Sequence, residues 1–454
     1  MIVPYKIKTV EPIFLPSREE REVALKKAGY NLFKLRAELV YIDFLTDSGT
    51  GAMSSAQWSR IMMGDESYAG SSSFYRLEAA VQEIMGLSYI VPTHQGRAAE
   101  NILDQVLVQK GTIVPGNAHF DTTKAHIEFH GGRAIDCTIK EGGDPEAEHP
   151  FKGNIDLQWL EEVVKKYGRE KIAYVLITIT CNTNGGQPVS MENIEAVSNY
   201  CRKNNLKIFF DAARFAENAF FIKQREKGFE NRSIHEIVKK MFSHVDGCTM
   251  SAKKDAIVPI GGFLAFRNEA LAEKVKQYEV LFEGFPTYGG MSGMDMEALA
   301  QGLREATDAA YLSHRVGQVA YLGKRLDECG IPLVKPFGGH AIFVNGRKFY
   351  KKVPEGQFPA HLLSVELYKE GGIRGCEVGM ALAGRDPETG ENIKTALDLC
   401  RMAIPRRVYS QEHFDYVVET VKSIHERDRN RTKGMAFEHE TKIMRHFTST
   451  FKYL

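Results

Sequence analysis

Residues 206–218 read LKIFFDAARFAEN, and this stretch decides the fold class. Its first five residues form a β-rich run that ends at Asp211, whose carboxylate suits either a ligand or a helix N-cap. Strands and helices that alternate through short connections predict an α/β fold with parallel crossovers, whose ligands bind at the carboxyl ends of the strands. Further β-rich runs occur at residues 89–93, 173–180, 247–250 and 261–266, and helical patterns at 98–109 and after the candidate N-cap Ser190.

The sequence pattern changes after about residue 305. Helical segments at 315–329 and 358–370 are accompanied by short β-rich runs at 339–344 and 403–405. We therefore predict a large domain with a mostly parallel sheet over residues 46–305. A smaller α+β domain is expected to combine residues 1–45 with residues 306–454.

The composition of the chain excludes several classes of protein. Its 454 residues are 43% hydrophobic and 26% charged with a net charge of +1, so the chain lacks the basic field of a nucleic-acid-binding protein. No apolar run approaches the ~18 residues of a membrane span. Lys6, Lys8 and Glu11 lie where a secretory signal would be apolar. We expect a soluble, cytoplasmic protein with no nucleic-acid or membrane partner.

Cysteine and histidine spacing gives little sign of a structural metal site. The seven cysteines are scattered and form no C-x-x-C pair, so we expect buried thiols rather than a disulfide framework or a zinc site. His126 and His130 are four residues apart, but the order H-x-E-x-H and the following glycines favour an exposed loop over a zinc-binding helix. The mixed charges of residues 425–433 indicate a solvated helix end closed by Gly434.

Three polar features follow predicted strands and together suit pyridoxal phosphate. Lys254 in SAKKDA supplies an amine that can form an imine with the cofactor's aldehyde. Asp211 supplies a carboxylate for the pyridine nitrogen. The turn at residues 95–97 precedes a helix whose first N–H groups suit a phosphate, and Ser251 offers a hydroxyl to the same group. Taken singly, these features have simpler interpretations: a solvated lysine pair, a helix N-cap and a tight turn.

Longer motifs then give a specific resemblance that covers the chain from about residue 5 to its end. The chain resembles the β-eliminating lyases, fold-type I pyridoxal-phosphate enzymes with an aspartate-aminotransferase-like fold that release indole from tryptophan or phenol from tyrosine. The motifs are LTDSGTGAMS (45–54), GDESYAG (64–70), PTHQGRAAEN (92–101), NGGQPVS (184–190), FDAARFAENAFFIKQRE (210–226), MSAKKDA (250–256), FPTYGG (285–290), GGHAIFV (338–344), FPAHLLSVELYKEGGIR (358–374) and RHFT (445–448).

The resemblance implies a role for each matching residue of the cofactor site. Lys254 is the lysine that binds the cofactor covalently, and Lys253 helps to hold the site. Asp211 is the partner of the pyridine nitrogen, and Phe120 stacks on the ring. The cofactor's 3′-oxygen is assigned to Arg214 and Asn182, and its phosphate to Gln95, Gly96, Arg97 and Ser251.

The resemblance also implies the residues that contact substrate and cation. Arg401 in RMAIP binds the substrate α-carboxylate together with Thr46 and Ser48, since a planar guanidinium meets a carboxylate with two bonds. Tyr68 is a catalytic tyrosine that reaches in from a neighbouring subunit, within a homotetramer built from catalytic dimers. Glu66 and the main chain at Gly49 and Pro259 bind a monovalent cation, K⁺ or NH₄⁺.

Three positions separate the two activities of this family. Tyrosine-cleaving members have an arginine where this chain has Val378, a threonine where it has Asp121 and a phenylalanine where it has His446. Tryptophan-cleaving members share the aspartate and the histidine. On residue chemistry alone, without the resemblance, Asp121 is better explained as a cap on its loop and His446 as a hydrogen-bonded core histidine.

The function expected from these positions is β-elimination of L-tryptophan to indole, pyruvate and ammonium. Lys254 is expected to take the α-proton, and Tyr68 and Asp121, with His446, to assist the departure of indole. The alternatives are a tyrosine phenol-lyase, an aminotransferase of the same fold, and a cofactor-binding protein without catalysis. Val378, Asp121 and His446 disfavour the first alternative. The presence of Lys254, Asp211 and Arg401 together disfavours the last.

Overall fold

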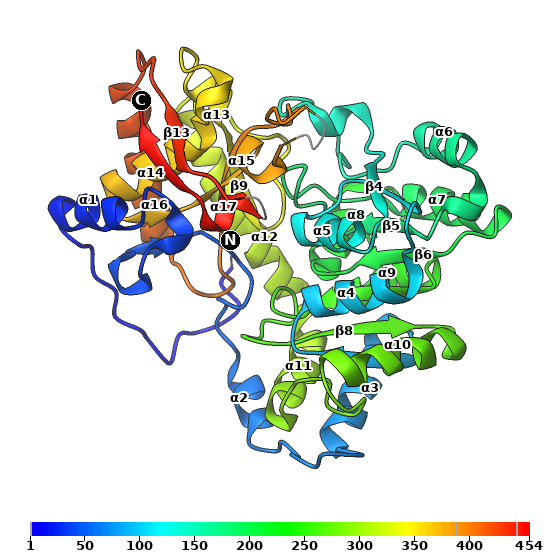
Figure 1. The fold of residues 1–454 in the computed structure, drawn as a ribbon. Coiled ribbons are helices and arrows are strands. Elements are labelled where there is room, and N and C mark those ends of the chain that lie inside the picture. The colour runs from blue at the N-terminus through cyan, green and yellow to red at the C-terminus, as the bar shows by residue number, and fades with distance from the viewer. Residues whose placement is uncertain (1, 386–388, 442–443) are drawn as a thin grey trace. The chain divides into compact units, whose positions relative to one another are not determined.

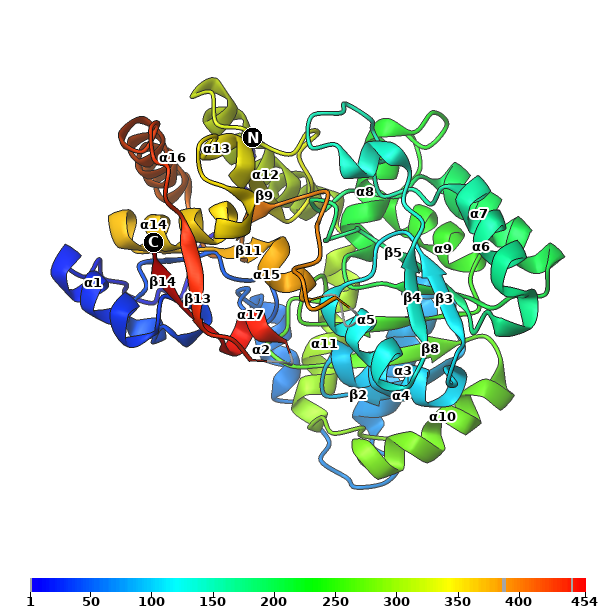
Figure 2. The same cartoon turned by 45° about the horizontal axis from the view of Figure 1, so that its top comes forward.

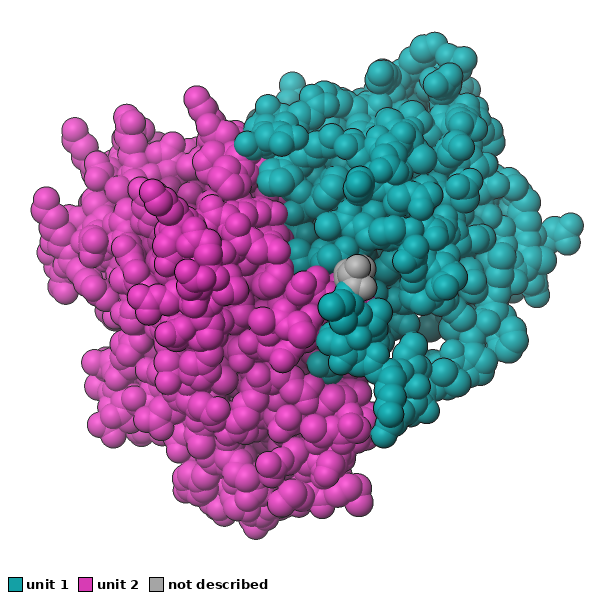
Figure 3. Space-filling view, turned by 180° about the vertical axis from the view of Figure 1, so that it is seen from behind, with its two compact units in different colours: residues 1–47, 143–148, 316–454 teal, residues 48–142, 149–315 magenta. Residues whose placement is uncertain are grey.

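The computed structural model describes residues 2–385, 389–441 and 444–454, which form two compact units (Figure 3). Unit 1 contains residues 1–47, 143–148 and 316–454, and unit 2 contains residues 48–142 and 149–315. The order of helices and strands along the chain can be followed in Figure 1. None of the described helices combines the length and the apolar character that a membrane span requires.

A seven-stranded sheet in the order β2-β8-β7-β6-β5-β3-β4 forms the centre of unit 2. Only β8 runs opposite to the other six strands, so the predicted mostly parallel α/β sheet is confirmed. Figure 2 shows β3 and β4 side by side at one edge of this sheet. The strands are β2 (Tyr89–Thr93), β3 (Ile113–Gly116), β4 (Arg133–Asp136), β5 (Val175–Thr178), β6 (Ile208–Asp211), β7 (Gly247–Ser251) and β8 (Gly262–Phe266).

The strands of unit 2 are apolar on both faces because helices cover both. Phe209 of β6 belongs to a buried cluster with Ile102 of α4 and Val275 of α10. The next residue, Phe210, points to the opposite face, where its ring lies 5.4 Å from that of Phe242 of α9. The helices of unit 2 are α2 (Ser55–Ile61), α3 (Ser72–Met85), α4 (Gly96–Leu107), α5 (Asp121–Phe129), α6 (Leu157–Tyr167), α7 (Met191–Lys203), α8 (Phe215–Arg225), α9 (Ile234–Ser243), α10 (Glu269–Phe282) and α11 (Gly293–Ala306).

The described residues of unit 1 form three small sheets and several helices. An antiparallel sheet has the order β11-β12-β9, β1 pairs with β10 in parallel, and β13 and β14 form an antiparallel ribbon. The strands are β1 (Ile42–Asp43), β9 (Ala341–Asn345), β10 (Ile373–Arg374), β11 (Cys376–Val378), β12 (Leu399–Ala403), β13 (Met435–His439) and β14 (Thr450–Tyr453). The helices are α1 (Arg18–Lys27), α13 (Gly346–Phe349), α14 (Pro359–Gly371), α15 (Met380–Ala383), α16 (Gln411–Arg427) and α17 (Arg445–Thr448), and α12 (Ala309–Glu328) contains the boundary near residue 316.

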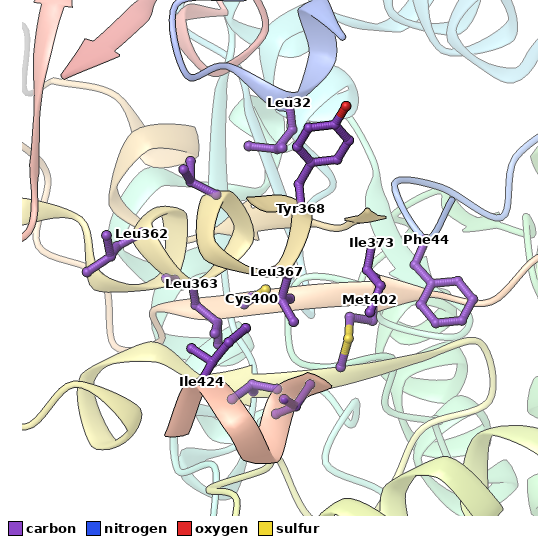
Figure 4. Packing of buried hydrophobic residues seen from close by; sticks show 14 of the residues in the cluster. Leu32, Phe44, Leu362, Leu363, Leu367, Tyr368, Ile373, Cys400, Met402 and Ile424 are labelled. Atoms are coloured by element: carbon purple, nitrogen blue, oxygen red, sulfur yellow. The ribbon is translucent and has the colours of Figure 1, made fainter. Parts of the chain in front are cut away.

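The core of unit 1 is centred on α14, whose sequence PAHLLSVELYKEG is buried around nearly its whole circumference. Leu363 and Leu367 of α14 belong to one cluster with Cys400 and Met402 of β12 and Phe44 from the N-terminal segment (Figure 4). Because this cluster draws residues from both ends of the chain, the N-terminal segment folds as part of unit 1.

The structure corrects three local expectations. The strand predicted at 403–405 is β12, four residues earlier, which places Arg401 in its middle. β8, for which no direction was predicted, is antiparallel because no helix lies between Ser251 and Gly262 to form a parallel crossover. His126 lies in α5 rather than in a loop, and His130, which follows the end of this helix, forms a hydrogen bond with Asn101 at 3.0 Å. α16 ends at Arg427, which pairs with Glu366 at 2.7 Å, so the charged run is not simply solvated and Gly434 does not close this helix.

Candidate active site

The carboxyl ends of the parallel strands of unit 2 bring most of the predicted cofactor residues to one edge of the sheet. Thr93 of β2 and Ser251 of β7 both pair with Gly262, and Asp211 of β6 pairs with Thr249 of β7. The segments that follow these strand ends carry Gln95, Gly96, Arg97 and Lys254, and the segments that follow β3 and β5 carry Phe120, Asp121 and Asn182. The fold therefore gathers these segments as the sequence predicts.

Lys254 lies in a tight turn directly after β7. Its Nζ donates a hydrogen bond to Ser251 Oγ at 2.8 Å, so the predicted covalent lysine and a predicted phosphate ligand are in contact. The amine also lies close enough to Asp211 for its charge to oppose the rise in pKa that burial causes in that carboxyl. The side chain and the carbonyl of Lys253 both lie next to Gly49. Burial, together with the charge of Arg97, lowers the pKa of Lys253.

Asp211 is a buried carboxylate at the end of β6. Burial raises its pKa, whereas Lys254 and Arg214 act in the opposite direction, so a further cation at this place would favour the ionised form. Its Oδ1 accepts from the N–H of Ala213 at 3.2 Å, which holds the side chain in a local turn. Asn182 is buried in the turn that follows β5, where its carbonyl accepts from the N–H of Gly185.

The turn at Gln95, Gly96 and Arg97 opens α4 and lies against β7. Gln95 is the N-cap and makes no side-chain cap bond, so the first N–H groups of this helix have no acceptor from that side chain. A Cβ on Gly96 would lie 2.6 Å from Ser251 Cβ, which only glycine avoids. The helix N-terminus and the Ser251 hydroxyl thus form one polar region suited to an anion.

Phe120 and Asp121 lie at the start of α5, and the Glu100 carboxylate of α4 binds the first turn of this helix. Phe120 is the N-cap, and Asp121 Oδ1 accepts from the N–H of Thr122 at 2.7 Å. The hydroxyls of Thr122 and Thr123 each donate to Glu100 at 2.8 Å. Burial, reinforced by Asp211, raises the pKa of Glu100 to about 8. Sequence reasoning missed Glu100, although a carboxylate beside the buried positions of α4 in GRAAEN was the available signal.

The predicted cation residues lie in unit 2 with partners of their own. A Cβ on Gly49 would lie 2.9 Å from the Pro259 carbonyl oxygen, so these two main-chain segments are adjacent, and Gly49 has a φ of +76°. Both Glu66 oxygens accept from the start of α11, from the N–H of Gly293 at 2.8 Å and of Met294 at 3.0 Å.

Tyr68 lies on the surface of unit 2 and is 69% exposed. Its ring is 5.2 Å from that of Tyr288 and 5.6 Å from that of Phe285. A hydrogen bond with Tyr288 raises the pKa of Tyr68. An exposed phenol held by two rings of the FPTYGG segment is accessible to a second protein chain.

Two predicted carboxylate-binding residues of unit 1, Arg401 and Thr46, lie beside and within the segment at residues 45–47. Arg401 projects from β12, and its Nη2 donates to the Leu45 carbonyl at 3.0 Å, beside Thr46. Arg406 holds the same segment through a buried ion pair with Asp47 at 2.8 Å. Ser48, the third predicted member, follows directly in the chain and is half-buried within unit 2.

Val378 and His446 lie in neighbouring segments of unit 1. Val378 ends β11, is 5% exposed, and packs with Phe343, Leu399 and other residues of a small apolar cluster. His446 lies in α17, where its ring is 5.9 Å from that of Phe33. Arg445 joins the two stretches, since its Nε donates to the Ala381 carbonyl at 2.9 Å and its Nη2 to the Gly384 carbonyl at 2.9 Å.

The donor set of unit 2 fits pyridoxal phosphate. Lys254 offers an amine for the aldehyde, and Asp211 offers a buried carboxylate for the ring nitrogen. Gly96 lets the start of α4 approach Ser251, and together these groups suit the phosphate. Among the described residues, no three His, Cys, Asp or Glu side chains converge as a metal site. The seven cysteines are free thiols, and six of them are buried, as predicted.

Fold and site together define a fold-type I pyridoxal-phosphate enzyme. The chain resembles the solved aspartate aminotransferase from Thermotoga maritima with a TM-score of 0.61 and 13% sequence identity, over 90% of this chain and 95% of that one. The aromatic aminotransferase from Pyrococcus horikoshii gives a TM-score of 0.60 at 15% identity, over 91% of this chain and 100% of that one. At sequence identities this low, the structural likeness establishes the fold but not the activity.

The sequence model for the Beta-eliminating lyase family matches residues 43–420, and the chain belongs to this family of pyridoxal-phosphate-dependent lyases. It is 55% identical over 444 residues to a "Probable beta-eliminating lyase" from Trichomonas vaginalis, covering 98% of this chain and 97% of that protein. It is 50% identical over 449 residues to a tyrosine phenol-lyase from Symbiobacterium thermophilum, covering 99% and 98%. It is also 50% identical over 454 residues to a tryptophanase from Hyphomonas neptunium, covering 100% and 99%. Overall identity therefore does not separate the two substrates.

Proposed function

We propose that this lyase cleaves L-tryptophan to indole, pyruvate and ammonium. The observation that carries the proposal is the residue set at the three positions that distinguish the two activities, namely Val378, Asp121 and His446. Each of them suits indole, and a phenol-specific site would need an arginine where Val378 stands. The proposal goes beyond the family assignment, which the two activities share.

Each proposed role uses a chemical property of the side chain. Pyridoxal phosphate, when bound, supplies an electron sink for the charge left at the substrate's Cα. Lys254 Nζ takes the α-proton, and Asp211 keeps a proton at the ring nitrogen. The phosphate is held by the start of α4 and by Ser251, the ring by Phe120, and the 3′-oxygen by Arg214 and Asn182. Arg401, Thr46 and Ser48 bind the substrate α-carboxylate.

The departure of indole determines the remaining roles. Indole leaves well only after its C3 is protonated, which places positive charge on the ring nitrogen. Tyr68, supplied by a neighbouring subunit, delivers that proton, and the Asp121 carboxylate stabilises the charge. His446 orders the pocket, and Val378 keeps one wall apolar. A homotetramer of catalytic dimers and a cytoplasmic location complete the proposal.

Tyrosine phenol-lyase activity is the second candidate because a curated relative with that name is as similar to this chain as the tryptophanase. Expelling phenolate at a wall formed by Val378 would leave its oxygen without a charged partner. An unpaired buried polar group costs about 1–3 kcal/mol, and loss of a charge-assisted bond costs more. The side chain at position 378 therefore favours indole.

The experiment that tests the leaving-group role compares Asp121→Ala with the unmodified enzyme on two substrates. With L-tryptophan, turnover should fall by about 100-fold or more, as for loss of a preorganised charge partner. With S-methyl-L-cysteine, whose thiolate leaves without ring protonation, turnover should change little. Glu83→Gln, which alters an exposed ion pair with Arg304, serves as the matched control and should affect neither substrate. Equal losses on both substrates would remove Asp121 from the indole step.

We also infer a monovalent-cation site at Glu66 and the main-chain carbonyls of Gly49 and Pro259. The close approach of Gly49 to the Pro259 carbonyl supports this inference, because two carbonyl oxygens on adjacent segments suit a hard cation. The charge of Glu66 would compensate that of the ion. K⁺ or NH₄⁺ is the proposed occupant.

A further inference from the structure

Helix α8, which follows the Asp211 and Arg214 motif, takes its N-terminal cap from a distant part of the chain. Its own N-cap residue, Arg214, makes no side-chain cap bond. Instead Asp255 Oδ2 accepts from the N–H of Ala216 at 2.8 Å and of Glu217 at 3.3 Å. Asp255 is 2% exposed, and a carboxylate at a helix N-terminus is favoured by both hydrogen bonding and the helix dipole.

Asp255 is also the residue directly after Lys254. Its own N–H donates to the Ala213 carbonyl at 3.4 Å, so the side chain and backbone of one residue both bind the segment 213–217. Asp211 lies just before this segment and Arg214 lies within it, and the two are proposed to bind the cofactor ring and its 3′-oxygen. One buried residue thus joins the segment that carries the lysine to the segment that carries the ring partners.

The far side of the lysine turn is held by a second buried side chain. Gln57 of α2 donates from Nε2 to the carbonyls of Ala256 at 3.1 Å and Ile257 at 3.2 Å. Ile257 has a φ of +52°, a conformation that a β-branched residue adopts only when its surroundings enforce it. A Cβ on Gly302 of α11 would lie 1.9 Å from the Ala256 carbonyl oxygen, so α11 also closes on this turn.

We propose that Asp255 is a positioning residue that fixes where the Lys254 amine lies relative to Asp211, with Gln57 as the opposing support. The inference rests on the proposed covalent role of Lys254. Condensation of the amine with the cofactor's aldehyde releases one water and requires the two groups to meet in a narrow geometry. A lysine on an unsupported turn samples many positions, and a displacement of about 1 Å at a reacting group can cost roughly 100-fold in rate.

The test measures how fast the apoenzyme binds pyridoxal phosphate covalently, followed by absorbance and by borohydride reduction with peptide mapping. Asp255→Ala should slow attachment to Lys254 at least tenfold and should lower kcat for S-methyl-L-cysteine more than it changes KM. Asp255→Asn keeps a carbonyl oxygen for the α8 N–H groups and should recover most of the rate. Asp156→Ala removes an aspartate cap of the same kind from α6, where Asp156 accepts from Trp159 N–H at 3.1 Å, and should leave the rate unchanged.

The possible outcomes separate this inference from the function on which it rests. Reduction onto a lysine other than Lys254 would remove both. Attachment to Lys254 at the same rate in Asp255→Ala and Asp156→Ala would overturn the role of Asp255 and leave the lysine assignment intact. If Asp255→Ala does not fold, Gln57→Ala tests the same turn from the opposite side, and an unchanged attachment rate in that variant would also contradict the proposal.

Discussion

Buried carboxyl groups of unit 2 differ in how their charge is compensated. Asp211 lies near Lys254 and Arg214, and the Asp255 carboxylate accepts two helix N–H groups. Glu279 of α10 is compensated less, because its side chain is fully buried, neither of its oxygens has a hydrogen-bond partner among the described residues, and the charge of Lys276 offsets only part of the effect of burial. Burial raises the pKa of Glu279 to about 9, with Glu283 adding to the effect and Lys276 opposing it.

Glu279 therefore makes the stability of the protein depend on pH. Between the ordinary glutamate pKa of about 4.3 and a folded-state value of about 9, the folded chain binds one proton more than the unfolded chain. The free energy of unfolding should therefore fall by about 1.4 kcal/mol for each unit of rising pH in this window. Glutamine stays neutral at every pH, so Glu279→Gln should lose this part of the pH dependence. Denaturant unfolding of both proteins at pH 6 and pH 8 would measure the free energies of unfolding. An identical pH dependence in the variant and the unmodified protein would contradict the assignment.

The cation site gives a second prediction at the scale of single residues. A fixed set of oxygens favours one ion size, so activity in K⁺ or NH₄⁺ should exceed activity in Na⁺ by about tenfold. Glu66→Gln keeps an acceptor for the N–H groups of Gly293 and Met294 but removes the charge, and it should require a higher K⁺ concentration for half-maximal activity. Equal rates of the unmodified enzyme in Na⁺ and K⁺ would count against the site.

At the scale of single elements, the close contact between α4 and β7 depends on one glycine. Gly96→Ala would bring a methyl group to 2.6 Å from Ser251 Cβ, so the start of α4 must move away from β7. The affinity for pyridoxal phosphate should fall at least tenfold, measured by titration of the apoenzyme, because the helix N–H groups and the Ser251 hydroxyl would separate. Gly356→Ala, where a Cβ meets open space, is the control. An unchanged affinity would show that this approach does not form the phosphate site.

Several elements of the fold could be predicted from sequence because their signals are local. β2 coincides with its predicted range, and Ser190 caps α7 through the Asn193 N–H at 3.1 Å. The direction of β8 depends on a missing helix rather than on its own residues, so periodicity did not reveal it. Glu100 and Asp255 were missed because burial of a carboxylate is decided by partners far along the chain, such as Thr122 or Ala216.

At the scale of the whole molecule, the two compact units contain different parts of the proposed chemistry. Unit 2 carries the cofactor residues around Lys254, and unit 1 carries Arg401, Val378 and His446. Family membership was predictable because long motifs occur along nearly the full chain. The substrate is a finer property, since a tyrosine phenol-lyase and a tryptophanase are each 50% identical to this chain. The catalytic role proposed for Tyr68 requires a second chain. Because the structure contains a single chain, this role stays a prediction.

The most direct measurement supplies L-tryptophan and L-tyrosine separately to the enzyme loaded with pyridoxal phosphate in K⁺ buffer, and identifies the products. Val378 and Asp121 predict indole and pyruvate from L-tryptophan, with a kcat/KM at least 100-fold above that for L-tyrosine. This ratio corresponds to the roughly 3 kcal/mol or more lost when a developing phenolate has no charged partner. Phenol released from L-tyrosine at an equal or higher kcat/KM would contradict the account, and a keto acid formed without indole or phenol would indicate transamination instead.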